Sequence, residues 1–448
     1  MRRESAVRGD LVVTWAEMPR SPGHAFYDKL QAVLTEAGFD AFVEETCRPF
    51  YAARMGAPSL PPGRYFRMHM VGYFEGIDSE RGIAWRCADS FSLRDFLRLG
   101  TRDNVPDHSW LSKTRSRLPH EAHETIFRWV LALVAEHGLV KGERIGVDGS
   151  TMEASAALRT IVRRDNGETY REMLTRMAKE SGVETPTIDD LVRLDRKRKG
   201  KTLSNADWTS PTDPDAKIAR MKHGSTHLAY KPEHAVDLDT GVIVAAPLHP
   251  ADDGDTTTLP GTLEATARNL AAVGLAPTPE QPCGLVTDKG YHSREGLKAL
   301  EGGAWKTRIA EPQPANGFLR WHGDDAARAA VYANRARLKS GVGRAAMRKR
   351  GEMVERSFAH VLDRGGMRRT WLRGRDNAHK RYLVHVAGFN LGILMRALFG
   401  CGTPRQAAAA KNVLLCIVQG DATLVIVVLA ASGGEMAILV IVVASQPA

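Results

Sequence analysis

Two short apolar runs, far apart in the sequence, each end on an aspartate. Ile145–Val147 leads to Asp148, and Leu285–Thr287 leads to Asp288. Short apolar runs between polar segments predict buried strands, so each aspartate is expected at a strand end. For either aspartate alone the plainer interpretation is a loop cap, because Asp favours caps and turns. Together they favour an α/β fold that delivers two carboxylates to one edge of a sheet.

A third acidic position lies in a basic, helix-like stretch. Glu355 has the apolar neighbours Val354 and Phe358, which predicts that it lies toward the buried side of an amphipathic helix. Glu352 is the alternative, since residues three apart share a helix face. A surface glutamate paired with an arginine is the plainer interpretation. Three carboxylates at one point are what a two-metal phosphodiester-cleaving site needs, because Mg²⁺ prefers oxygen ligands.

The order of segments predicts how the chain is divided. Residues 1–140 read as an all-helical N-terminal region. From 141 to 400, strands alternate with helices, which predicts a mixed sheet flanked by helices, interrupted by a polar, basic insertion at 153–222. The tail, 401–448, holds two apolar runs that are too short to cross a membrane. They predict either a strand hairpin or sequence foreign to a native domain, such as a frameshifted end.

Charge and cysteine usage narrow the class of protein. The chain of 448 residues has 62 Lys and Arg against 52 Asp and Glu, a formal net charge of +10. Such an excess favours a polyanionic partner, of which nucleic acid is the commonest. The five cysteines are scattered without a CxxC pair. This argues against a zinc ribbon or a disulfide framework and fits a reducing cytoplasm.

Several basic clusters are candidate DNA contacts. Two predicted helices, 93–99 with an N-cap at Ser92 and 107–118 with an N-cap at Asp107, resemble a helix-turn-helix. The alternative is an ordinary helical hairpin with a solvated basic face. The basic run in the insertion is either a flexible DNA-contacting arm or a solvated linker. The candidate contacts are Lys113, Arg115 and Arg117; Arg196, Lys197, Arg198 and Lys199; Lys289; and Arg344, Arg348, Lys349 and Arg350.

Two further clusters have the residue types of metal sites without their patterns. His223, His227 and His234 lack helical spacing with an HExxH glutamate, so surface or strand-end histidines are favoured over zinc ligands. The loop 252–255 has three aspartates but lacks the twelve-residue calcium pattern and its closing glutamate. An N-cap for the next helix, at Asp255 or Thr256, accounts for it.

Many segments, in order, resemble the DDE transposases of bacterial insertion sequences, whose catalytic domain is RNase-H-like. The resemblance extends from about residue 20 to about residue 400 and fades in the tail. Relatives carry a tyrosine seven residues and an arginine four residues before the catalytic glutamate, whereas this chain has Arg348 and Gly351 there. The matching segments are 71–85, 92–97, 107–109, 146–148, 207–215, 254–257, 288–293, 355–360 and 366–369.

The resemblance implies an RNase-H-like core in which Asp148, Asp288 and Glu355 are catalytic residues and metal ligands. It implies two Mg²⁺ ions, with Mn²⁺ as a substitute. It also implies that the N-terminal helical region recognises the terminal inverted repeats of the element, that target DNA is a second partner, and that a homodimer forms on DNA. A bacterial cytoplasmic, nucleoid-associated protein with no membrane association is expected.

The function implied is cleavage of DNA at element ends and joining of 3′-hydroxyls to target DNA. One alternative is a non-catalytic DNA-binding relic: the intact acidic triad argues for chemistry, and the unusual tail argues for a relic. Another is a structure-specific nuclease on the same core. The insertion and the helical N-terminal region favour transposition, because a plain nuclease needs neither.

Overall fold

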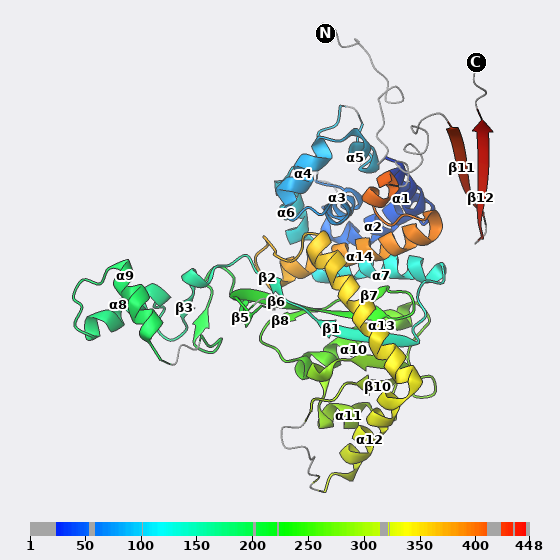
Figure 1. The fold of residues 1–448 in the computed structure, drawn as a ribbon. Helices are drawn as coiled ribbons and strands as arrows, with labels where there is room; N and C mark the ends of the chain where they lie inside the picture. The colour runs from blue at the N-terminus through cyan, green and yellow to red at the C-terminus, as the bar shows by residue number, and fades with distance from the viewer. Residues whose placement is uncertain are drawn as a thin grey trace.

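The computed structural model describes residues 24–52, 59–100, 102–199, 203–221, 224–313, 321, 323–409, 423–432 and 435–444. Its centre is a mixed sheet in which β10, β9, β1 and β6 lie in that order, with β7 also paired to β6 (Figure 1). These strands are β1 (Arg144–Gly149), β6 (Thr226–Asp237), β7 (Ile243–Ala245), β9 (Cys283–Thr287) and β10 (Trp305–Ile309).

Strand directions decide where the two predicted aspartates lie. β1 is antiparallel to β6 and parallel to β9, and β9 is parallel to β10. The carboxyl ends of β1, β9 and β10 therefore share one edge of the sheet. β6 and β7 form a hairpin, whose turn has Gly241 at a φ of 83°, a conformation that favours glycine. The fold-class prediction, a mixed sheet with flanking helices, is confirmed.

The first half of β6 carries three short strands that were not predicted. They are β2 (Met152–Glu153), β5 (Lys217–Arg220) and β8 (Leu248–Pro250), all antiparallel to β6. Strands of two to four residues give too little periodicity to be detected from sequence. β2 and β5 stand at the two ends of the predicted insertion, so the sheet itself frames that segment.

Helices cover both faces of the sheet. α13 (Gly341–Phe358) crosses one face, where a Cβ on Gly146 would lie 3.1 Å from Cγ2 of Val354, so the helix packs directly on the backbone of β1. α10 (Asp255–Ala272) covers the other face, where Asn269 donates to the carbonyl of Val244. A π-helical turn, η5 (Ala359–Arg364), continues α13. The helices α11 (Arg294–Leu300) and α12 (Asp325–Lys339) lie near β10.

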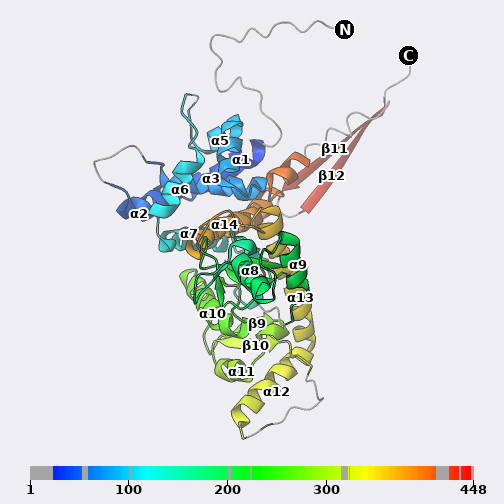
Figure 2. The same cartoon turned by 90° about the vertical axis from the view of Figure 1, so that its left-hand side faces the viewer.

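The N-terminal region is all-helical, as predicted, and packs against the last long helix, α14 (Arg375–Phe399) (Figures 1 and 2). α14 is long and apolar enough to cross a membrane, but most of that apolar window is buried inside the protein against α3 and α7. This is the pattern of a core helix. The N-terminal helices are α1 (His24–Glu36), α2 (Phe39–Cys47), α3 (Pro62–Glu75), α4 (Glu80–Ala88), α5 (Phe91–Phe96), α6 (His108–Arg117) and α7 (His120–Glu136).

Helix caps confirm one boundary and correct another. Asp107 caps α6 as predicted, accepting hydrogen bonds from the backbone N–H groups of Ser109 and Trp110. The predicted cap of α5 at Ser92 is wrong, because Ser90 accepts from the N–H of Leu93 and starts the helix two residues earlier. Both serines precede the same apolar residues, so sequence alone does not separate the two positions. The predicted N-cap of α10, at Asp255 or Thr256, is also wrong. Gly254 occupies the N-cap position, and no side chain makes a capping hydrogen bond there.

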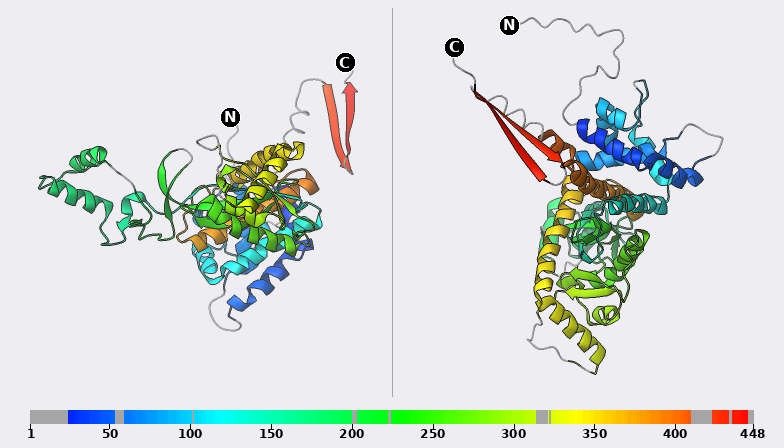
Figure 3. Two further views of the ribbon diagram at one scale, coloured as in Figure 1. Left: turned by 90° about the horizontal axis from the view of Figure 1, so that it is seen from below. Right: turned by 90° about the vertical axis from the view of Figure 1, so that its right-hand side faces the viewer.

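The insertion forms an arm that projects from the side of the sheet (Figure 3). It holds α8 (Tyr170–Glu180) and α9 (Ile188–Lys197), each starting with a capping box, and the strand pair β3 (Val162–Arg163) and β4 (Trp208–Thr209). The first part of the basic run is helical, because Arg196 and Lys197 lie in the last turn of α9. In the tail, β11 (Thr423–Ser432) and β12 (Glu435–Ala444) pair as an antiparallel hairpin.

Candidate active site

Asp148 and Asp288 lie side by side at the carboxyl edge of the sheet. Val147 of β1 is in register with Thr287 of β9, so the next residue in each strand is an aspartate at the same level. Asp148 is the penultimate residue of β1, and Asp288 caps a short 3-10 turn, η4 (Lys289–Tyr291). The prediction that two strand ends deliver these carboxylates to one edge agrees with this register.

Both carboxylates are oriented in the same way. Asp148 Oδ1 accepts a hydrogen bond from the N–H of Gly149 at 2.8 Å. Asp288 Oδ1 accepts from the N–H of Gly290 at 2.9 Å. In each case a backbone amide fixes one oxygen and leaves Oδ2 directed elsewhere. A carboxylate held by the backbone loses little side-chain entropy when it binds a ligand.

The guanidinium of Arg350 lies between the Oδ2 atoms of the two aspartates. Nη2 of Arg350, from α13, is 2.7 Å from Asp148 Oδ2 and 3.9 Å from Asp288 Oδ2. The Arg350 side chain is only 12% exposed, whereas those of Asp148 and Asp288 are 22% and 41% exposed. Two like charges this close to one another need a cation, and the guanidinium supplies it here.

The donor set at this edge fits a hard divalent cation. Asp148 and Asp288 offer carboxylate oxygens that solvent reaches, which is the chemistry Mg²⁺ and Mn²⁺ select. Within the described residues, no three acidic, histidine or cysteine side chains come close enough together to hold one ion. Among the described residues, the edge therefore presents two neighbouring carboxylates.

Glu355 and Glu352 lie three residues apart on α13 and differ in their partners. Glu352 is ion-paired with Arg356 on the exposed surface of the helix. Glu355 is also exposed, and it makes no hydrogen bond or ion pair with any residue that the structure describes. Helical geometry puts Glu355 about 60° round the axis from Phe358. The ring of Phe358 stacks on His234, the residue opposite Asp148 in β6, so the exposed Glu355 lies one helical turn or less from a residue that contacts the strand next to β1.

A buried ionic cluster supports the edge from the opposite face of the sheet. Glu233 of β6 is fully buried, and its Oε1 lies 3.0 Å from both Lys231 Nζ and the Tyr291 hydroxyl. Lys231 Nζ is also 2.6 Å from Asp255. Burial, followed by the charges of Glu233, Asp255 and Asp148, raises the pKa of Tyr291. The hydroxyl therefore stays protonated and donates to Glu233.

Gly149, which follows Asp148 at the edge of the sheet, lies against this ionic cluster. A Cβ at Gly149 would lie 2.9 Å from Cε of Lys231 and 3.5 Å from the Tyr291 hydroxyl. The cluster was missed by sequence reasoning. The available signal was the presence of charged residues within a strand that is otherwise apolar, since a buried charge must be paired.

The histidines do not form a zinc site among the described residues. His234 is fully buried and uses both ring nitrogens, at 2.7 Å from Ser357 Oγ and 2.5 Å from the Tyr382 hydroxyl. Burial lowers the pKa of His234 to about 3, so the ring is neutral. His227 faces Glu153 at 3.4 Å, and His223 lies outside the described residues.

Arg115, one of the predicted DNA contacts, stabilises the helical region instead. Arg115 is buried and ion-paired with Glu80, so it ties α6 to α4 and has no free guanidinium to offer. Its neighbours on α6 lie over rings, Lys113 over Trp110 and Arg117 over Tyr51. The sequence pattern of a basic helix face does not reveal that one of its members turns inward.

The other predicted DNA contacts differ in their exposure and in their ion pairs. Arg196, Lys197 and Lys199 are exposed on the arm, whereas Arg198 faces Asp195 at 3.6 Å. Lys289 is exposed beside Asp288, and Arg344 and Arg348 are exposed on α13. Lys349 is held by Asp239 at 3.0 Å. Arg350, predicted as a DNA contact, faces the two aspartates instead.

Comparison with protein families gives two matches. A model described as "Transposase domain (DUF772)" matches residues 16–117, and one described as "Transposase DDE domain" matches residues 198–391. Asp288 and Glu355 lie inside the second match, while Asp148 lies between the two. Searches of curated proteins and of solved structures gave no significant match. With a helical transposase domain followed by a DDE domain on a mixed, RNase-H-like sheet, the chain belongs to the DDE transposases of insertion sequences.

Proposed function

We propose that this transposase cleaves DNA at the ends of its insertion sequence and joins the resulting 3′-hydroxyls to target DNA. The observation that carries the proposal is the pair of backbone-fixed carboxylates, Asp148 and Asp288, whose second oxygens converge on one positive charge. In this proposal Asp148, Asp288 and Glu355 are the metal ligands. Residues 1–140 recognise the terminal inverted repeats, residues 141–400 carry the chemistry, and a homodimer assembles on DNA in the bacterial cytoplasm.

The residues have separate tasks in this scheme. When two divalent ions are bound, they supply activation of the attacking water or 3′-hydroxyl and stabilise the departing oxygen. The amides of Gly149 and Gly290 hold the carboxylates of Asp148 and Asp288 in fixed directions. Glu355 swings in from α13 as the third ligand. Lys289, exposed next to Asp288, is placed to contact a phosphate.

The proposal predicts a strict requirement for a hard divalent cation. The purified protein should nick a duplex carrying the element end in Mg²⁺ or Mn²⁺ and not in EDTA, because the site offers only oxygen ligands. Ca²⁺ should not support nicking, because it takes oxygen ligands at longer distances and in a looser geometry than Mg²⁺. Denaturing gel electrophoresis of end-labelled duplex measures the nick, and a duplex with a scrambled end is the control. Cleavage in EDTA at the rate seen with Mg²⁺ would contradict the proposal.

A second prediction concerns Arg350 and the metal-free protein. The guanidinium lies where a cation would neutralise the two aspartates, so it competes with metal ions. Arg350→Gln should therefore tighten Mn²⁺ binding by about tenfold or more, because a charge a few ångströms away is worth more than about 1 kcal/mol even when screened. Electron paramagnetic resonance titration of free Mn²⁺ measures this without any reaction.

Arg348→Gln is the matched control for the Arg350 variant. It removes the same charge from the same helix, but Arg348 is exposed and has no ion pair with a described residue. Its Mn²⁺ affinity should stay within about twofold of the parent value, as expected for a screened surface charge. Equal affinities for the parent and both variants would show that Arg350 does not compete with the metal.

A further inference from the structure

A groove lined by arginines lies on another face of α13 from the aspartates. It consists of a cavity of about 250 Å³ between α13, α14 and the turn after β6, and an adjoining cavity of about 270 Å³ beside α3 and η5. The two share Tyr73, His360 and Thr403 in their walls. On α13, Val354 packs on the sheet, while Met353 and Arg356 line this groove, so the two features are separate.

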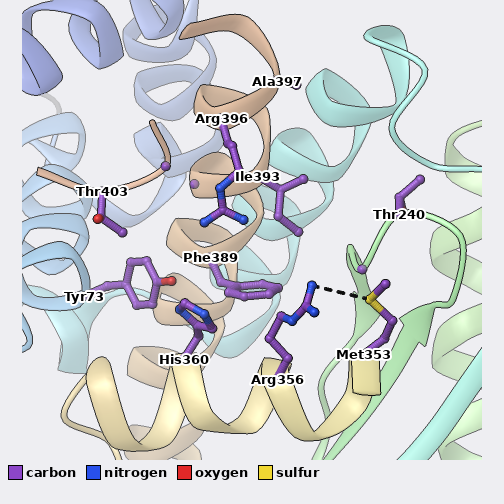
Figure 4. Close-up of a pocket in the computed structure, with 13 residues that line it drawn as sticks. Tyr73, Thr240, Met353, Arg356, His360, Phe389, Ile393, Arg396, Ala397 and Thr403 are labelled. Atoms are coloured by element: carbon purple, nitrogen blue, oxygen red, sulfur yellow. Dashed lines mark hydrogen bonds between the residues drawn. The ribbon is translucent and has the colours of Figure 1, made fainter. Parts of the chain in front are cut away.

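Positive charge converges on the groove from three elements. Arg356 comes from α13, Arg364 from η5 and Arg396 from α14. Figure 4 shows the guanidinium groups of Arg356 and Arg396 reaching into the cavity on either side of Phe389 and His360. Arg364 and Arg396 make no ion pair with any described residue. Arg405 adds a further positive charge to the wall of the adjoining cavity.

Glu75, an acidic residue in the wall of the groove, already has partners. Glu75 lines the adjoining cavity, but it accepts a hydrogen bond from the Tyr27 hydroxyl at 2.7 Å and lies 3.5 Å from Arg86. Burial, followed by the positive charges of Arg364, Arg396 and Arg356, lowers the pKa of His360. Arg356 is paired with Glu352, whereas Arg364, Arg396 and Arg405 have no ion pair with a described residue. The groove therefore keeps a net positive potential, which favours an anionic ligand.

The backbone at this point has an unusual form. His360 and Arg364 both lie in the π-helical turn η5, which breaks the α-helical register of α13. Turns of this type are rare and often occur at functional sites. The plainer explanation of Arg396 is that it neutralises the carbonyl end of α14, in whose last turn it lies. That explanation does not extend to Arg356 or Arg364, which come from other elements.

We propose that this groove binds backbone phosphates of DNA, as a contact separate from the aspartate edge. The inference rests on the proposed function and names a second surface for the same substrate. Two adjoining open cavities lined by Arg356, Arg364, Arg396 and Arg405 suit successive phosphates of one strand better than a single small anion. Contacts of this type carry affinity and salt dependence and no sequence information.

The test is the salt dependence of DNA binding, measured by fluorescence anisotropy in EDTA so that no cleavage occurs. The probes are a duplex bearing the element end and a scrambled duplex. Arg364→Gln and Arg396→Gln should each lower the slope of log affinity against log salt by about 1, and the double variant by about 2, on both duplexes. Arg268→Gln, a half-exposed arginine on α10 across the sheet, is the control and should keep the parent slope.

The outcomes separate the proposal from the proposed function. A double variant with the parent slope overturns the groove as a DNA contact. A second result would also overturn the groove as a DNA contact. In that result, inorganic phosphate raises the melting temperature of the parent and not of the double variant, while the two proteins bind DNA equally. Melting temperatures check that the variants fold, and Arg396→Lys should retain the slope because it keeps the charge. Failure of the parent to cleave in Mg²⁺ would count against the proposed function and leave the binding comparison intact.

Discussion

Replacing Asp148 with asparagine is expected to lower the rate of DNA cleavage at least about a thousandfold, equivalent to about 4 kcal/mol of transition-state stabilisation. The amide oxygen can still accept the hydrogen bond from Gly149, so the local backbone should be retained. The negative charge that a hard cation needs is lost. Single-turnover nicking of an end-bearing duplex measures the effect. Binding of the same duplex should persist and still weaken steeply with salt, because phosphate contacts dominate it.

Asp252→Asn is the matched control for this experiment. It makes the same chemical change in an exposed loop that precedes α10. Its nicking rate should equal that of the parent within about twofold, as for a typical surface substitution. Cleavage by Asp148→Asn at the parent rate would mean that Asp148 only caps the loop after β1, and the assignment of the site would fail.

Glu355→Gln is expected to abolish strand transfer, while Glu352→Gln should leave most of it. The two side chains share one helix but differ in surroundings. Glu352 is committed to Arg356 on the solvent side, whereas Glu355 lies on the flank next to Phe358 and has no described ion partner. A lost metal ligand removes several kcal/mol of transition-state stabilisation, and a lost surface ion pair on a helix removes only about 0.5 kcal/mol of stability.

The two glutamate variants control for each other, since the chemical change and the helix are the same. Joining of a pre-cleaved 3′ end to plasmid DNA measures strand transfer. A Mn²⁺ titration of both proteins gives an independent reading, in which only Glu355→Gln should bind the ion more weakly. The opposite pattern, with Glu352→Gln inactive and Glu355→Gln active, would reassign the third ligand without affecting the fold.

The strands that position the two aspartates were predictable because their signal is local. An apolar run ending on a polar residue indicates both the strand and the residue at its edge, as at Asp148 after β1 and Asp288 after β9. Long amphipathic helices such as α7 were also predicted, since their period of 3.6 is repeated over several turns. The register that puts Asp148 beside Asp288 followed from the parallel pairing of the strands.

What could not be predicted depends on contacts between distant residues. Arg350 looked like other arginines of a basic helix until α13 was placed on β1, where it faces Asp148. Arg115 looked exposed until α4 brought Glu80 against it. The pairing of Lys231 with Glu233 needs the strand to be buried on both faces. In each case the sequence specifies the residue, and only packing specifies its partner.

The arm has a consequence for how elements of this kind diversify. Glu153 of β2 and Lys217 of β5 both pair with Ala229 of β6, one from each side. The two ends of the arm are therefore fixed opposite the same residue of the sheet. A loop whose ends are fixed that closely tolerates changes of length at small entropic cost. The segment can therefore be shortened, enlarged or exchanged between lineages while the strands carrying Asp148 and Asp288 remain as they are. Changes in the length of the arm therefore leave the register that places Asp148 beside Asp288 as it is.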